Sequence, residues 1–117
     1  MADTQRIPPQ NIEAEQSLLG SLLIDKDGLL KIADSVNPED FYKDSHQMIF
    51  ESMLELFNGR EPIDLLSLGN KLEEKKQLTT VGGRGYLIEL SHIVPTAAHV
   101  VHFAVIVQKK ATLLRLQ

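Results

Sequence analysis

Apolar side chains recur at helical spacing between Ser45 and the Asn58-Gly59 pair, a pair of residues that commonly ends a helix. The apolar positions of this segment are Ile49, Phe50, Met53, Leu54 and Phe57. Polar residues lie between them, so the pattern predicts an amphipathic helix with one face in a core. The apolar face must pack against other elements, and the rest of the sequence contains further helical patterns that can bury it.

Five further segments show helical patterns bounded by cap or turn residues. Asn11 can cap the first, which would place Glu13 and Glu15 in its positive first turn. Residues 37–40 predict a capped turn after the second segment, and residues 82–83 predict a turn in which glycine supplies positive φ. We expect helices over residues 12–24, 29–36, 64–76, 86–90 and 97–117.

The segment from Val100 to Val107 is rich in β-branched residues, which favour strands. One strand among helices would have no pairing partner, and the sequence contains no second strand candidate of similar strength. We therefore predict a helix from Ala97 to Gln117, about 31 Å long at 1.5 Å per residue.

The length of 117 residues fits one domain. Pro8 and Pro9 disfavour helix, so residues 1–10 are predicted to form a flexible tail. Residues 11–95 are predicted to form a helical bundle, and residues 96–117 a long C-terminal helix. The predicted fold class is all-α.

The net charge of −4 argues against a dedicated nucleic-acid binder, so we expect weak or no DNA binding by this chain. Residues 1–89 hold all 16 acidic residues, whereas residues 90–117 hold only basic charges, at Lys109, Lys110 and Arg115. The chain has no cysteine, no apolar stretch long enough to cross a bilayer and no secretion signal in its first residues. We expect a cytoplasmic protein.

No phosphate-binding Walker A loop is present, and Gly83 and Gly85 form only part of a dinucleotide-binding motif. His92, His99 and His102 could suggest a metal site, but supporting acidic ligands are missing from their segment. The sequence therefore predicts no catalytic residue, no cofactor and no metal in this chain. We expect His46 to lie in the first turn of its helix with a structural hydrogen bond.

The C-terminal helix is apolar on more than one side and lacks a C-cap residue, which is typical of a domain cut from a longer protein. A stripe through Ala97, Val101 and Ala104 is predicted to seat it on the bundle. Tyr86 fits the core and an interface equally well. The aromatic residues expected in the core are Phe41, Tyr42, Phe50 and Phe57. The candidate protein-interface residues are Tyr86, Phe103, Ile106, Lys110, Leu113 and Leu114.

Six sequence blocks follow one another from Pro8 to Arg115 with characteristic gaps. They are Pro8-Pro9 with residues 11–20, Asp40-Phe41-Tyr42 with His46, residues 62–65, Val81-Gly82-Gly83 with Tyr86, residues 95–98, and residues 106–111 with Arg115. Their order resembles the amino-terminal domain of bacterial replicative DNA helicases of the DnaB type. The sequence departs from that pattern at Gly85, His99 and Phe103.

The resemblance implies a domain of a ring-shaped hexameric, ATP-driven DNA helicase. It implies a small helical bundle followed by a helical hairpin that pairs subunits, with residues 97–117 as the start of a truncated hairpin. Primase would dock on this domain, and the helicase loader is a further expected partner. ATP and Mg²⁺ would bind a separate RecA-like ATPase domain that this chain lacks. The residues alone leave open a free-standing helical adaptor or a small enzyme.

Overall fold

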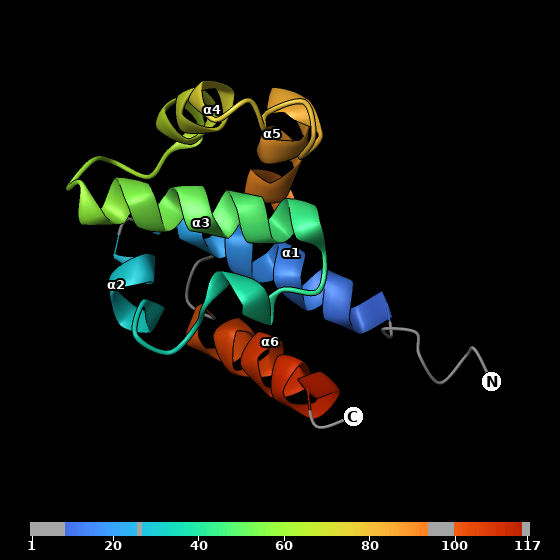
Figure 1. Ribbon diagram of the computed structural model, residues 1–117. Helices are drawn as coiled ribbons and strands as arrows, with labels where there is room; N and C mark the ends of the chain where they lie inside the picture. Colours follow the sequence, from blue (N-terminus) through green and yellow to red (C-terminus); the bar gives the residue numbers. More distant parts are fainter. Residues whose placement is uncertain (1–8, 26, 94–99, 116–117) are drawn as a thin grey trace.

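The computed structural model describes the backbone of residues 9–25, 27–93 and 100–115 and the side chains of residues 12–25, 27–93 and 100–108 (Figure 1). Every regular element in these ranges is helical, which confirms the all-α prediction. The elements are α1 (Pro9–Ile24), α2 (Gly28–Ile32), the 3-10 helix η2 (Pro38–Asp40), α3 (Asp44–Asn58), α4 (Leu65–Glu74), α5 (Gly83–Ile93) and α6 (Val100–Arg115).

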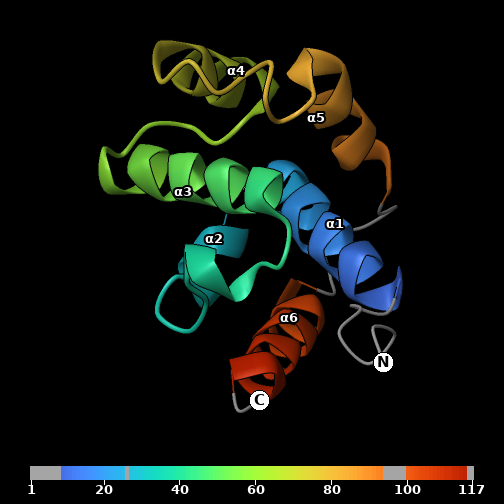
Figure 2. The same ribbon diagram turned by 45° about the vertical axis from the view of Figure 1, so that its right-hand side comes forward.

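The helices form three layers. Helices α1 and α3 cross in the middle, α4 and α5 cover one side, and α2, η2 and α6 cover the other, as Figures 1 and 2 both show. Each of the six α-helices contributes buried apolar side chains. The largest fully buried residues are Phe41, Phe50, Leu18, Leu19, Leu22, Leu29, Ile32, Ile49, Met53, Leu56, Leu68 and Leu72.

Helix α1 begins at Pro9, so the predicted start at Ile12 is wrong. Proline is tolerated in the first turn of a helix, because the amide hydrogen that it lacks would have no partner there. Residues 9 and 10, expected in the tail, therefore belong to α1, and residues 1–8 lie outside the described residues. Asn11 lies inside the helix instead of capping it, and Glu15 lies beyond the first turn.

The elements from α2 to α4 agree with the sequence predictions except at the end of α2. Helix α2 is shorter than predicted and ends at Ile32, but the capped turn that follows is confirmed, because the Asn37 amide donates to Asp40 Oδ2 at 2.9 Å. Helices α3 and α4 are confirmed close to their predicted bounds. Asp64 caps α4, its Oδ1 accepting from the Ser67 amide at 2.8 Å.

The turn into α5 contains Gly82, and Gly83 is the first residue of the helix; their φ angles of +111° and +76° confirm the predicted role of glycine there. A Cβ on Gly82 would lie 2.8 Å from Tyr86 Cβ, so the absence of a side chain at Gly82 also leaves room for Tyr86. Helix α5 is longer than the predicted segment of residues 86–90, because it starts directly at Gly83.

We expect Gly82→Ala to lower the free energy of unfolding by about 1–3 kcal/mol, because alanine combines positive φ with a clash against Tyr86. Gly85→Ala is the matched control, since Gly85 lies within α5 with open space at its Cβ position. That variant should gain about 0.5–1 kcal/mol of stability. Urea denaturation of both variants measures the difference, and equal effects would contradict this account of the turn.

Helix is confirmed from Val100 through Val107, despite the strand-forming residues. In the predicted buried stripe Ala104 is confirmed as buried, but Val101 is wrong, because it is 51% exposed and the buried positions beside Ala104 are Val100 and Val107. These three positions follow helical spacing and face α1, η2 and α2. Ala97 lies outside the described residues.

Candidate protein-interaction site

A buried carboxylate on α1 holds the start of α3. Glu15 is 3% exposed, and its Oε2 accepts from the Tyr42 amide at 2.6 Å. Its Oε1 accepts from the Lys43 amide at 3.5 Å and contacts His46 Nδ1 at 2.7 Å. Lys43, the N-cap residue of α3, makes no side-chain cap of its own. A negative charge at a helix N-terminus is favourable, so Glu15 adds to the charge of Asp44 in the first turn and supplies the side-chain acceptor that Lys43 cannot.

His46 extends this contact to α5. Its side chain is fully buried in the first turn of α3, and its Nε2 lies 2.6 Å from the Tyr86 hydroxyl. The predicted position of His46 and its structural hydrogen bond are confirmed. The Tyr86 hydroxyl also accepts from Gln16 Nε2 at 3.2 Å, and the Tyr86 ring stacks on the imidazole. One hydrogen-bonded chain thus joins α1, α3 and α5.

Sequence reasoning missed the role of Glu15, although a signal was present. Glu15 precedes Leu18, Leu19 and Leu22 by three, four and seven residues. This spacing puts it on the buried face of α1, where a carboxylate needs hydrogen-bond donors. The pattern indicated a buried acid, but the donors lie 27 to 31 residues away in the sequence.

Tyr86 belongs partly to the core and partly to the surface. Its ring is half-buried and packs against the core cluster, while Lys43 Nζ lies 5.8 Å from the ring centroid. Burial raises the pKa of Tyr86 above its ordinary value, and the negative charges of Glu89 and Glu15 raise it further. The hydrogen bond from Gln16 lowers the pKa and opposes these effects only in part.

The raised pKa of Tyr86 predicts a loss of stability in alkali. A phenol that ionises less readily in the folded state stabilises the fold below its unfolded pKa, and this stabilisation is lost as pH rises through the folded pKa. Above pH about 10, the parent should therefore lose stability faster than Tyr86→Phe. Thermal melts across this range test the effect. Tyr42→Phe, at a 56% exposed tyrosine, should keep the parental slope.

The candidate interface residues on α6 occupy different environments. Phe103 and Ile106 are half-buried and pack against the core, so much of their apolar surface is already covered within the domain. Phe103 precedes the buried Val107 by one turn, which places it beside the buried stripe. The side chains of Lys110, Leu113 and Leu114 lie outside the described residues.

Two valines form the exposed apolar surface of α6. Val101 is 51% exposed and Val105 is 47% exposed, and four residues separate them, so they lie on one face. We call this pair the α6 outer stripe. His102 lies between them in sequence and is also exposed. Sequence reasoning missed this stripe because it assigned Val101 to the core.

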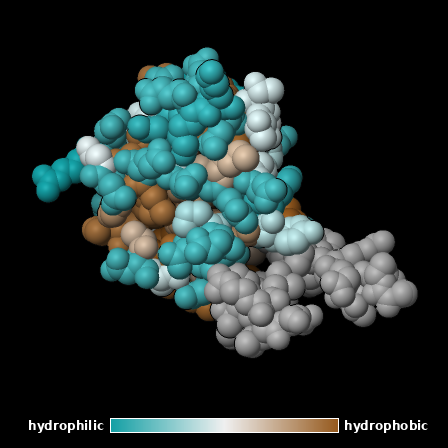
Figure 3. All heavy atoms as spheres, in the orientation of Figure 1, coloured by the Kyte–Doolittle hydropathy of each residue, from teal (hydrophilic) through white to brown (hydrophobic). Residues whose placement is uncertain are grey.

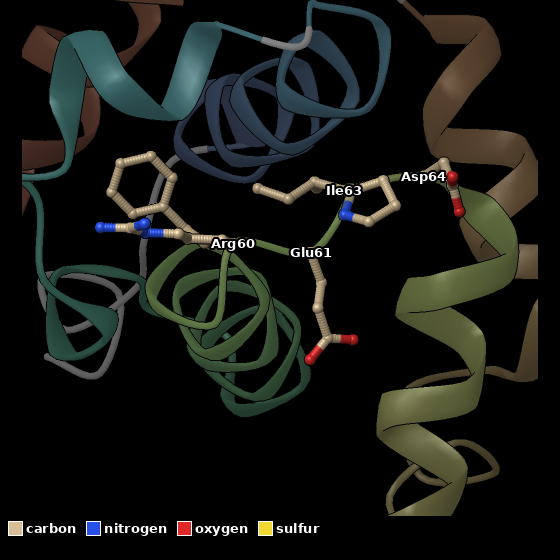
Figure 4. A pocket seen from close by; sticks show the side chains of 6 residues that line it. Arg60, Glu61, Ile63 and Asp64 are labelled. Carbon is tan, nitrogen blue, oxygen red and sulfur yellow. The ribbon is translucent and has the colours of Figure 1, made fainter.

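Two clefts lie on other parts of the surface. A cleft of about 380 Å³ follows the α3–α4 connection, lined by Phe57, Pro62, Ile63 and three charged residues (Figure 4). A smaller apolar cleft lies between α4 and α5, with Leu66 and Ile88 exposed at its edges. Figure 3 shows apolar residues exposed among polar ones on one face of the molecule.

The described residues contain no group of three histidine or acidic side chains placed to hold a metal ion. Among these residues, no helix combines the length and the apolar character that crossing a bilayer requires. The site that the structure brings together is a hydrogen-bonded network with a half-exposed tyrosine, an arrangement suited to recognition.

Comparison with known families gives a match to the DnaB-like helicase N-terminal domain over residues 7–109. The chain belongs to this family. The resemblance seen in the sequence blocks is thus confirmed, and the DnaB-like domain accounts for nearly the whole chain. The interpretation as an unrelated adaptor finds no support.

The DnaB-like domain is similar to several replicative helicases. It is 45% identical over 113 residues to the replicative DNA helicase DnaB of Geobacillus stearothermophilus, covering 97% of the chain and 25% of that protein. It is 42% identical over 111 residues to the replicative DNA helicase DnaC of Bacillus subtilis (strain 168), covering 95% of the chain and 24% of that protein. The chain therefore spans about a quarter of the length of these relatives.

A solved structure shows the same fold. The N-terminal domain of DnaB helicase from Mycobacterium tuberculosis superposes with a TM-score of 0.89 at 39% identity. The match covers 94% of this chain and 80% of that one. The three-layered arrangement of the DnaB-like domain is therefore shared with a known member of the family.

Proposed function

We propose that this domain is the assembly and partner-docking domain of a hexameric replicative DNA helicase. The observation that carries the proposal is the 45% identity to a replicative DNA helicase across 97% of the chain. In the whole helicase to which this domain would belong, a separate RecA-like domain would bind ATP and Mg²⁺ and unwind DNA in the cytoplasm. The chain described here would contribute subunit pairing and the docking of primase, with the helicase loader as a further partner.

The surface of α6 supports the assembly role. The α6 outer stripe leaves two valines half-exposed on a helix that is already seated through Val100, Ala104 and Val107. Isolated exposed apolar residues are common, but a pair on one helical face offers a partner helix a continuous contact. Of the candidate interface residues, Phe103 and Ile106 lie on the same helix, which continues through Lys110, Leu113 and Leu114.

We expect Val105→Glu to weaken self-association of the chain at least tenfold. Burying a fully exposed valine contributes about 1.5–3 kcal/mol and a half-exposed one about half of that, and the new carboxylate would also have to lose water at the interface; about 1.4 kcal/mol corresponds to a factor of ten. Sedimentation equilibrium across a range of concentrations measures the change, and primase binding by calorimetry is recorded for the same samples. The melting temperature should stay close to that of the parent, because Val105 is 47% exposed.

Leu66→Glu is the matched control, since Leu66 is 68% exposed on α4 in the opposite layer. It should leave self-association unchanged. If Val105→Glu and Leu66→Glu associate equally, the α6 outer stripe is not the assembly surface. A parent chain that remains monomeric and does not bind primase at any accessible concentration would contradict the proposed function as a whole.

A further inference from the structure

Geometry determines where hydrogen lies in the Glu15–His46–Tyr86 chain. Both oxygens of the Glu15 carboxylate accept from backbone amides, those of Tyr42 and Lys43. An ionised Glu15 carboxylate can only accept hydrogen bonds, so His46 Nδ1, at 2.7 Å from Oε1, carries a hydrogen and donates it. The remaining ring nitrogen, Nε2, is the one position of the imidazole where a proton can be absent or present.

The Tyr86 hydroxyl can satisfy either state of Nε2. When Nε2 is bare, the hydroxyl donates its hydrogen to Nε2 at 2.6 Å and accepts from Gln16 Nε2. One lone pair of the hydroxyl then remains unused. When Nε2 carries a proton, the hydroxyl accepts from both His46 and Gln16, and its own hydrogen is free to point elsewhere.

We propose that His46 is a proton-linked switch that sets the hydrogen-bonding polarity of Tyr86. With a neutral imidazole, Tyr86 presents an acceptor to a group outside the network, such as a partner's amide or ammonium. With a protonated imidazole, it presents a donor, suited to a carboxylate or a carbonyl. The Tyr86 ring stays in place in both states, because the stacking on His46 and the packing under it do not change.

The surroundings of His46 suit a switch that leaves the fold intact. The charged or titratable groups near the network are Glu15 on α1, Lys43 at the start of α3, and Tyr86 and Glu89 on α5. From the segment after η2, the neighbour is the Phe41 ring, edge-on to the imidazole with centroids 6.4 Å apart. The carboxylate of Glu15 can neutralise an added positive charge directly, so protonation needs no movement of a helix.

Nuclear magnetic resonance of the intact chain tests the switch. The ¹⁵N shifts of the His46 ring should show a hydrogen on Nδ1 and none on Nε2 in the neutral state. As pH falls, the ring signals of Tyr86 should move with the same midpoint as the His46 nitrogens. His92, an exposed histidine on α5, is the internal reference and should titrate without effect on Tyr86.

The variant His46→Asn removes the titrating group while keeping an amide that can donate to Glu15. In this variant the Tyr86 response over the same pH range should vanish, whereas His92→Asn should retain it. If His46→Asn does not fold, the parent spectra decide by themselves. A neutral His46 with its hydrogen on Nε2, or a Tyr86 response that does not follow the His46 midpoint, would overturn the proposal.

Discussion

Replacing Glu15 with methionine should lower the free energy of unfolding by about 3–5 kcal/mol, because each buried donor left unsatisfied costs about 1–3 kcal/mol. The loss arises because three N–H donors, from Tyr42, Lys43 and His46, would be left without their acceptor inside the protein. Methionine has nearly the same length, so the cavity contribution is small. This loss is a large part of the roughly 5–15 kcal/mol typical of a domain.

Glu13→Met is the matched control for this experiment. Glu13 lies two residues earlier on α1 and is exposed, so its replacement should change stability by no more than about 0.5 kcal/mol. Urea denaturation followed by circular dichroism compares the two variants. If Glu15→Met were as stable as Glu13→Met, the network would contribute nothing to holding α3 and α5 on α1.

Phe50→Ala is expected to cost about 3–5 kcal/mol, because it leaves a cavity in a closely packed core. Phe50 is fully buried on α3, and its ring packs against Phe41 with centroids 5.1 Å apart. Chemical denaturation and the melting temperature both report the change. The cooperative unfolding transition of the variant should occur at a lower denaturant concentration than that of the parent.

Tyr42→Ala tests the opposite expectation at a neighbouring aromatic residue. The sequence predicted Tyr42 in the core, but the structure leaves it 56% exposed, so the prediction is wrong. Its replacement should cost no more than about 0.5 kcal/mol, as is usual for surface positions. A loss comparable with that of Phe50→Ala would mean that Tyr42 is buried in solution.

The error at Tyr42 has a simple cause. Phe41 has extended backbone angles of φ −82° and ψ +134°, and in extended backbone successive side chains point in opposite directions. Burying Phe41 therefore exposes Tyr42. The prediction placed both aromatic residues in the core as if they shared one face of a helix. They lie between η2 and α3, where helical spacing does not apply.

Sequence patterns predicted the helices better than their faces. α3 and α4 have strong local signals, an amphipathic repeat in one and the Asp64 cap in the other, and both lie close to their predicted bounds. α6 has valine on several sides, so its sequence allows more than one buried stripe. Contacts with α1, η2 and α2 determine that Val100, Ala104 and Val107 form the buried face of α6. Those three elements lie in distant parts of the sequence.

The network around His46 could be predicted only in part. The first-turn position of His46 follows from the helix pattern, and the spacing of Glu15 from the buried leucines indicates its burial. The pairing of Glu15, His46 and Tyr86 does not follow, because 31 and 40 residues separate His46 from its two partners. Only the crossing of α1, α3 and α5 brings these side chains together.

The middle position of α1 has a thermodynamic consequence. α1 packs against α5 on one side and against α6 on the other, so it is common to both outer layers. A ligand on one outer layer that shifts or stiffens α1 changes the affinity of the opposite layer for its own ligand. By linkage the second ligand must affect the first by the same factor. α1 is therefore the helix through which binding on one outer layer would be linked to binding on the other.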